Sequence, residues 1–159
     1  MKIKRKKGAF DVAIASVVGL MLIIGVFYNS IYTNIENMKY DILSQYGRDA
    51  LLILESKDEV SRSYLTDIKV KLSSKLIYET GEYIKVYVII DGIEYDSESM
   101  PSTVKTIYGE PIKIKIDYHY TPRRLDLTNL APKKDTSKNE RIMGINLQTI
   151  CRNRGVSDD

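Results

Sequence analysis

The sequence is poor in the residues on which most enzyme and disulfide chemistry depends. Its 159 residues include one cysteine, Cys151, one histidine, His119, and no tryptophan. One thiol cannot form an intramolecular disulfide, so the fold must hold by packing alone. One histidine leaves a His-based metal site or a His-activated nucleophile without its partners. We expect Cys151 to be a packed or idle thiol and His119 to occupy an exposed strand position.

Other motifs of ligand-binding chemistry are also missing. The glycines form no phosphate-binding loop, because Gly8, Gly19 and Gly25 lie in or beside a long apolar run. A solvated hairpin explains the clustered acids better than a calcium loop, whose spacing they lack; they are Asp91, Glu94, Asp96 and Glu98. The sequence therefore predicts a non-catalytic protein with no cofactor, no metal site and no small-molecule substrate.

Acids are absent from the first ten residues, whereas cations crowd the first seven. Five of the 24 Lys and Arg residues lie there: Lys2, Lys4, Arg5, Lys6 and Lys7. The remaining 19 cations stand against 21 acids, which leaves the rest of the chain with a net charge of −2. Nucleic-acid binding needs a clustered basic face, so we expect no nucleic-acid partner. We interpret residues 1–8 as a basic cytoplasmic leader that orients a membrane segment.

Charge is again absent from Val12 to Tyr32, which read VAIASVVGLMLIIGVFYNSIY. About 20 helical residues cross the hydrocarbon core of a bilayer, so residues 9–32 are predicted to form a transmembrane helix. A cleavable secretory signal has a shorter apolar region and ends in small residues, whereas this run is longer and ends in bulky ones. The cations before it predict a cytoplasmic N-terminus and an extracytoplasmic C-terminal domain, in a single-pass protein of the cell membrane.

Asp11, near the start of this run, has two interpretations. An acid in a membrane helix is costly unless it has a partner or lies near the interface. In the first interpretation, Asp11 lies at the cytoplasmic headgroup level, and the positive end of the helix dipole stabilises its charge. In the second, it makes a specific contact in an assembly.

The second interpretation of Asp11 rests on the stretch KRKKGAFDVAIASVV, and the first stays open beside it. A short basic leader ending in glycine, then a small residue and a hydrophobic helix with an acid near its start, resembles the class III signal of type IV pilin-like proteins. The chain is most similar to the Tad-type minor pseudopilins (TadE-like proteins). The resemblance implies that a prepilin peptidase cuts between Gly8 and Ala9, and that the helix then packs among other pilin-like subunits. Asp11 would offset the new terminal ammonium, although the family's usual glutamate falls where this chain has Ala13.

Proline is absent before Pro101, so nothing forces the helix to break outside the membrane. Apolar residues continue at helical spacing: Ile31, Ile35, Met38, Ile42 and Tyr46. The residues between them, including Lys39, are predicted to form a solvated face. We expect residues 33–56 to continue the helix outside the membrane, with Gly47 as a point where it could bend.

After the polar stretch 56–63 the hydrophobic period changes to two. Strands are predicted at 68–72, 83–90, 93–95 and 111–120, with a tight turn at Asp91–Gly92. Residues 57–122 should therefore form an antiparallel sheet domain covered by the outer half of the helix. Residues 123–159 should be an irregular segment with one short apolar element, 142–150, that returns to the sheet or packs alone. The predicted fold class is α+β, a long N-terminal helix packed on a small antiparallel sheet of about four strands.

Two functional hypotheses stay open at this point. The first is a membrane-anchored, pilin-like minor pseudopilin, a structural subunit of a type IV or Tad-like filament or secretion apparatus. The second is an uncleaved single-pass adaptor that presents an extracytoplasmic interaction domain in an envelope complex. A membrane-anchored enzyme is disfavoured because the chain lacks a catalytic constellation.

Overall fold

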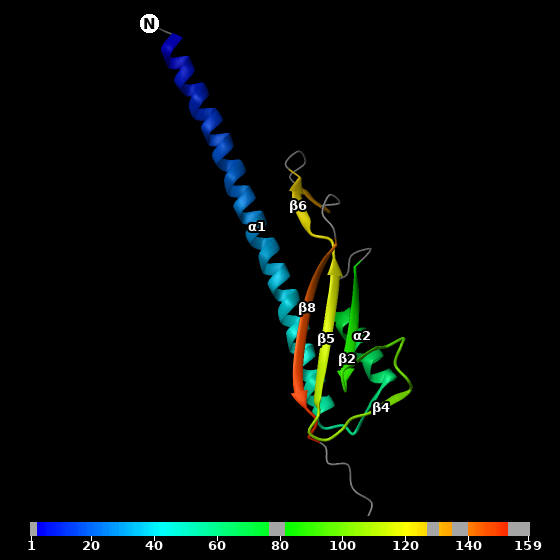
Figure 1. Cartoon of the computed structure of the whole chain (residues 1–159). Coiled ribbons are helices and arrows are strands. Elements are labelled where there is room, and N and C mark those ends of the chain that lie inside the picture. Colours follow the sequence, from blue (N-terminus) through cyan, green and yellow to red (C-terminus); the bar gives the residue numbers. More distant parts are fainter. Residues whose placement is uncertain (1–2, 77–81, 127–130, 135–139, 153–159) are drawn as a thin grey trace, which may run out of the picture. The chain divides into compact units, whose positions relative to one another are not determined.

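The computed structural model describes residues 3–76, 82–126, 131–134 and 140–152. Its first element is helix α1 (Ile3–Glu55), which runs unbroken for 53 residues (Figure 1). The absence of proline from this region predicts that continuity. The expected extension of the helix over residues 33–56 is confirmed as far as Glu55, and Gly47 does not interrupt it.

The chain forms two compact units. The first contains residues 1–37 together with residues 123–133. Its β-structure is a pair of short strands, β6 (Arg123–Asp126) and β7 (Ala131–Lys134), although Lys134 itself is assigned to the second unit. The second unit contains residues 38–122 and 134–159, and it holds the main sheet.

The main sheet has four antiparallel strands in the order β3-β2-β5-β8. Figure 1 shows β2, β5 and β8 side by side. They are β2 (Tyr83–Ile90), β3 (Ile93–Asp96), β5 (Pro111–Tyr120) and β8 (Arg141–Ile150). Asp91 and Gly92 connect β2 to β3 with φ values of 52° and 75°. Positive φ at both central residues is the signature of the tight hairpin turn that the Asp-Gly pair predicts.

The strand predicted at residues 68–72 is wrong, because this stretch lies in helix α2 (Arg62–Lys75). Leu65, Ile68 and Leu72 are buried at spacings of three and four, whereas Val70, which a strand would place beside Ile68 and Leu72, is 59% exposed. The Ser61 hydroxyl caps the helix by accepting a hydrogen bond from the Tyr64 N–H at 3.3 Å. Strand β1 (Glu59–Ser61) directly precedes this helix in the chain and pairs with β4 (Thr103–Lys105) in a separate two-stranded sheet.

The fourth strand of the main sheet is instead β8, so the expectation of an irregular segment over residues 123–159 needs correction. All ten residues of β8 pair with β5, from Arg141 opposite Tyr120 to Ile150 opposite Pro111. Of the two alternatives for residues 142–150, the return to the sheet is confirmed. The strand signal of β8 is weak because three of its outward-facing residues are poor strand formers. These residues are Gly144, Asn146 and Gln148.

One face of the main sheet forms the core. Alternate residues of β2 and β5 are buried there: Ile84, Val86, Val88, Ile90, Ile112, Ile114, Ile116 and Tyr118. Helix α1 covers this face with Leu43, Ala50 and Leu54, which are at most 4% exposed. The predicted cover of the sheet by the outer half of the helix is confirmed.

The approach of α1 to the sheet depends on Gly47. A Cβ atom at this position would lie 2.4 Å from the Ile145 Cδ1 and 3.1 Å from the Leu147 Cδ1. Gly47 therefore marks a point of close packing on β8 and not a bend in the helix.

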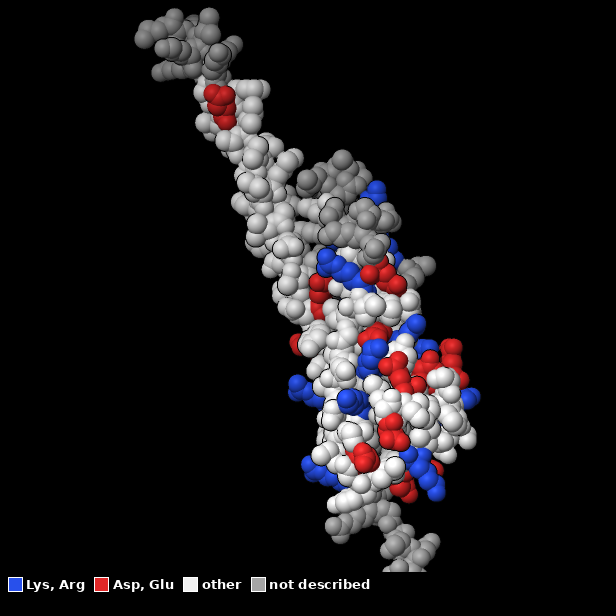
Figure 2. All heavy atoms as spheres, in the orientation of Figure 1, with Lys and Arg blue, Asp and Glu red and all other residues white. Residues whose placement is uncertain are grey.

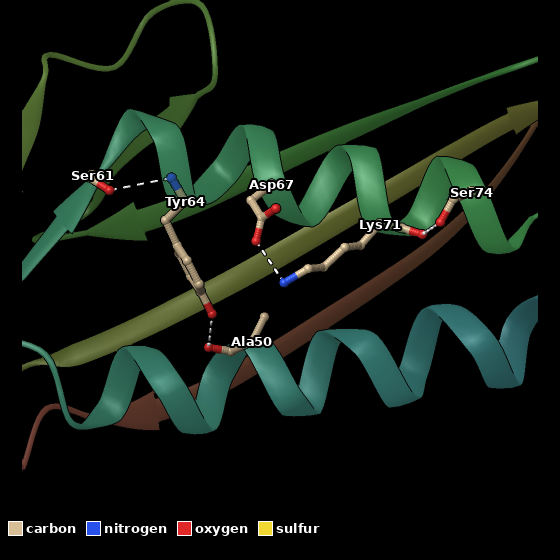
Figure 3. A network of polar contacts seen from close by, with 6 residues as sticks. All are labelled: Ala50, Ser61, Tyr64, Asp67, Lys71 and Ser74. Carbon is tan, nitrogen blue, oxygen red and sulfur yellow. Dashed lines mark hydrogen bonds and ion pairs between the residues drawn. The ribbon is translucent and has the colours of Figure 1, made fainter.

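Helix α2 lies beside α1 over the same sheet, and Tyr64 connects the two helices (Figure 3). Its hydroxyl donates a 3.0 Å hydrogen bond to the Ala50 carbonyl. Burial, with smaller effects from the charges of Asp67 and Asp49, raises the pKa of Tyr64 to about 12. Lys71 and Asp67, which are exposed on α2, form a 2.7 Å ion pair (Figure 3).

The raised pKa of Tyr64 predicts a loss of stability at alkaline pH. The protonated phenol is favoured in the folded state, so its contribution is complete below the unfolded pKa of about 10 and is lost as the pH rises to about 12. We expect the free energy of unfolding to fall less steeply between pH 10 and pH 12 in a Tyr64→Phe variant, measured by urea denaturation at each pH. An equal slope in Tyr64→Phe and the parent protein would contradict the assignment, and exposed Tyr83→Phe is the control.

Candidate functional site

The most distinctive surface of the chain is the apolar half of α1, from Phe10 to Tyr32. One helix among the described residues is long and apolar enough to cross a membrane, and none of its most apolar 18-residue window is buried. Eleven large apolar side chains between Phe10 and Tyr32 are at least 50% exposed: Phe10, Val12, Val17, Val18, Leu20, Met21, Leu22, Ile23, Val26, Phe27 and Ile31. In water each such side chain is unfavourable by roughly 25 cal/mol per Å² of apolar area, so exposure of this half of the helix to water is costly.

The length of the segment matches a bilayer. Residues 10–32 of a helix that rises 1.5 Å per residue extend about 33 Å, close to the thickness of the hydrocarbon core. No Lys, Arg, Asp or Glu lies between Asp11 and Glu36. On the face shown in Figure 2, charged side chains of both signs gather over the second unit, whereas the described apolar half of α1 is almost entirely free of them.

Two hydroxyl groups, one inside the apolar half and one just beyond it, are satisfied by the backbone of the helix. The Ser16 hydroxyl donates to the Val12 carbonyl at 2.9 Å, and Thr33, just beyond the segment, donates to the Asn29 carbonyl at the same distance. The rings of Tyr28 and Tyr32 lie 4.6 Å apart near the end of the segment, where an interfacial aromatic belt is expected. Because the backbone of α1 is helical throughout, its amides can also be buried in lipid without unsatisfied hydrogen bonds.

The predicted processing residues lie at the start of the same helix. Gly8 is exposed, and the Gly8–Ala9 bond is part of α1, which begins at Ile3. Asp11 is exposed and forms no hydrogen bond or ion pair with the residues that the structure describes. Of the orientation cluster, Lys4, Arg5, Lys6 and Lys7 have helical backbone, while Lys2 lies outside the described residues. The roles of Gly8, Ala9 and Asp11 stay predictions.

A buried polar cluster holds the start of the packed half of α1. The Lys39 ammonium donates to the Tyr118 hydroxyl at 2.7 Å, and this hydroxyl donates to the Glu82 carboxylate at 2.5 Å. Lys39 and Glu82 side chains are only 18% and 4% exposed, and their charged groups are 3.8 Å apart. The prediction that Lys39 lies on a solvated face is therefore wrong.

The buried face of α1 is rotated relative to the predicted one. Met38, at which the predicted stripe was centred, is 64% exposed, whereas Leu43 is fully buried. Lys39 and Leu43 are four residues apart and share one helix face. A stripe read through Leu43, Gly47, Ala50 and Leu54 would have placed Lys39 on the buried side.

His119 also differs from its prediction. It lies in the polar register of β5, as expected, but it is only 8% exposed. Its ring stacks on Tyr83 at 4.3 Å, and its Nδ1 lies 3.5 Å from a Glu140 carboxylate oxygen. The sequence pattern could not show this, because the covering ring comes from the neighbouring strand β2.

The remaining candidate groups are structural. Asp96 accepts hydrogen bonds from the N–H groups of Glu98 and Ser99 at 2.9 and 2.6 Å, and the bond from Ser99 is the main cause that lowers its pKa. The Cys151 thiol is buried 3.4 Å from the Thr106 hydroxyl. In the described part of the chain, no three His, Cys, Asp or Glu side chains gather closely enough to hold a metal ion.

Comparisons with known proteins add no assignment. No protein-family model matches the chain, and neither a curated protein nor a solved structure matches it. The functional argument therefore rests on the geometry of α1 and of the domain that packs on its second half.

Proposed function

We propose that this protein is a membrane-anchored, non-catalytic structural subunit of the pilin-like type, a minor pseudopilin of a type IV or Tad-like filament or secretion apparatus. The observation that carries the proposal is the division of one continuous helix into an unburied apolar half and a half packed on a sheet. A single helix of this kind can anchor a domain in the membrane and also pack against equivalent helices.

The apolar half also has features that suit association with other helices. Ala15 and Gly19 form a small-xxx-small pair, which lets helix backbones approach closely. Beyond the aromatic belt, Ile31 and Ile35 are 56% and 42% exposed on one helical stripe. In this proposal these residues pack against helices of other pilin-like subunits, and Asp11 offsets the terminal ammonium of Ala9.

The proposed orientation follows from the cation distribution. The leader at residues 1–8 stays in the cytoplasm, and the sheet domain lies outside the cell membrane. A prepilin peptidase is then the first partner, because it acts on the cytoplasmic side at the Gly8–Ala9 bond.

Processing is tested by coexpression with a prepilin peptidase. We expect the membrane-extracted protein to begin at Ala9, because the leader ends in glycine and is followed by an uninterrupted apolar helix. The measurement is the intact mass of the protein together with its N-terminal sequence. A Gly8→Leu variant is expected to keep Met1 and accumulate as precursor, whereas Gly19→Leu, inside the helix, is the control that should still be cut.

One observation favours a second function. Because α1 begins at Ile3, the Gly8–Ala9 bond is in a helix rather than in an extended segment that a peptidase could grip. The alternative is an uncleaved single-pass adaptor that presents the sheet domain to a partner in an envelope complex. Retention of Met1 in the parent protein, with unchanged mass in Gly8→Leu, would reject processing and favour the adaptor.

A further inference from the structure

Strands β6 and β7 are basic in a chain that is acidic beyond its leader. Their sequences, RRLD and APKK, carry four cations and one acid, which is a net charge of +3. Residues 9–159 as a whole have a net charge of −2, so without these two strands they have a net charge of −5. The positive charge of this short strand pair is therefore local and unlike that of its surroundings.

The two strands belong to the same compact unit as the apolar half of α1. That unit contains residues 1–37 and 123–133, and so every residue of β6 and β7 except Lys134. A two-stranded sheet alone is at best marginally stable in water, so β6 and β7 need a surface on which to pack. Helix α1 supplies the other described residues of this unit, and it is the surface available there.

Tyr28 shows where the strands lie along α1. The Arg123 guanidinium is close enough to the Tyr28 phenol for its charge to act on that group. The Tyr28 hydroxyl oxygen is buried, and the side chains of Tyr28 and Tyr32 are half-buried. Phe27 and Ile31, on other sides of the helix, are 67% and 56% exposed. The start of β6 therefore lies beside the two tyrosines, and the side of α1 that carries Phe27 and Ile31 is open.

This position is the level of a membrane interface. Tyr28 and Tyr32 lie at the end of the uncharged run, where an interfacial aromatic belt is expected. When α1 spans a bilayer, basic groups beside these rings are level with the phosphate groups of one leaflet. Lys133 on β7 is exposed, so its ammonium can donate to phosphate oxygens.

β7 suits a lipid surface better than an additional strand. Pro132, in the middle of this strand, has no N–H and cannot complete a ladder of backbone hydrogen bonds. Proline and lysine on an edge strand oppose pairing with another strand, whereas basic groups beside a membrane segment are attracted to anionic lipids. We propose that β6 and β7 rest on the membrane surface at the Tyr32 end of the spanning segment, where their cations bind the phosphate groups of anionic phospholipids.

This inference rests on the membrane anchoring in the proposed function, and it does not depend on cleavage at the Gly8–Ala9 bond. It adds a second contact with the bilayer. The rotation of a spanning helix about its axis is set by its neighbours and by interfacial anchors. Contact of β6 and β7 with one leaflet therefore fixes which side of α1 faces other helices, and this is the open side with Phe27 and Ile31.

The absence of tryptophan from the chain makes a fluorescence test possible. Full-length protein with Pro132→Trp, an exposed position, is reconstituted in vesicles of phosphatidylcholine and phosphatidylglycerol in equal parts. Lipids brominated near the headgroup quench an indole that touches them. We expect the introduced indole to be quenched in these vesicles and much less in vesicles of phosphatidylcholine alone. Leu125→Trp on β6 is a second reporter, with the same expected result, if the change at Pro132 disturbs β7.

The role of charge is tested in the Pro132→Trp background. Each Lys or Arg beside an anionic surface favours contact about fivefold. Arg123→Gln with Lys133→Gln should therefore lower the ratio of quenched to unquenched emission about 25-fold. Arg123→Lys with Lys133→Arg keeps both charges and should retain the quenching, which separates loss of charge from loss of packing.

Two further reporters set the outcome. Phe27→Trp lies in the spanning segment and should be quenched in vesicles of either composition. Ile93→Trp is the matched control, because Ile93 is 53% exposed on a hairpin of the second unit that carries Asp91 and Glu94. Its acids are repelled by anionic lipids, so we expect its indole to remain unquenched.

Three results would overturn the inference. They are equal quenching of Ile93→Trp and Pro132→Trp, quenching of Pro132→Trp that does not depend on phosphatidylglycerol, and unchanged quenching after both cations become glutamine. Failure of the surface contact is distinguished from failure of the proposed function by Phe27→Trp. Quenched Phe27→Trp with unquenched Pro132→Trp rejects the surface contact alone, whereas unquenched Phe27→Trp rejects the membrane anchor and the proposed function with it.

Discussion

Replacement of both Val18 and Leu22 by arginine is expected to move the protein from the membrane fraction to the soluble fraction. The two side chains are 51% and 67% exposed, so the change does not disturb a protein core. Each arginine at the centre of a membrane helix costs about 3 kcal/mol, so two cost about 6 kcal/mol, or roughly 10⁴-fold in the partition equilibrium. The measurement is the fraction of protein that resists carbonate extraction.

The matched control for this pair places two arginines at exposed apolar positions of the second unit. Val70 on α2 and Ile107 after β4 are 59% and 56% exposed. Val70→Arg with Ile107→Arg should leave carbonate resistance unchanged. If the Val18 and Leu22 variant remains in the membrane pellet as firmly as this control, the apolar half of α1 is not the anchor.

Replacement of Gly47 by leucine is expected to lower the free energy of unfolding by about 2 kcal/mol or more. Overpacking of a filled core typically costs 1–3 kcal/mol. Here a Cβ would lie 2.4 Å from the Ile145 Cδ1, and Ile145 is only 5% exposed, so this side chain has little room to move. The higher helix propensity of leucine returns about 0.8 kcal/mol and does not offset the clash. Urea denaturation of the detergent-solubilised protein measures the change.

Two variants identify the clash as the cause. Arg48→Leu changes the adjacent, exposed helix position and should leave the unfolding free energy within about 0.5 kcal/mol of the parent value. Ile145→Ala removes the obstructing atoms, so Gly47→Leu should cost less in that background than in the parent protein. A cost that is equal in both backgrounds would show that Gly47 matters for another reason.

The long apolar segment of α1 could be predicted from the sequence because its signal is local. Twenty-one uncharged residues after a block of cations indicate a spanning helix without reference to any other part of the chain. The same applies to the hairpin at Asp91–Gly92 and to β5, whose residues alternate strictly from Ile112 to Tyr120. In these elements residue type and backbone geometry agree at each position.

Burial depends on partners and was less predictable. The period-two reading of residues 68–72 chose Val70 as a core residue, although the helix that actually forms there buries Leu65, Ile68 and Leu72. Both patterns share Ile68 and Leu72, so a short segment does not distinguish them. The helix forms because its buried residues pack in the same core as residues of α1 and the sheet.

Polar residues in the core show the same limit. Lys39 is buried because Tyr118 and Glu82, both distant in sequence, supply a hydroxyl and a carboxylate. His119 is buried because Tyr83 covers its ring. A charged or polar side chain becomes a core residue only where its partners satisfy it, and the identity of those partners is set by strand and helix pairing.

The sequence by itself determined that one long helix has an unburied apolar half and that an antiparallel sheet follows it, because hydrophobic run length and period are properties of single segments. Only the tertiary structure decided that β8 forms the fourth strand, that Gly47 packs against it, and that no further strand of the described chain pairs with its outer edge. These features depend on which segments meet, and β8 has too weak a pattern of its own to reveal its partner.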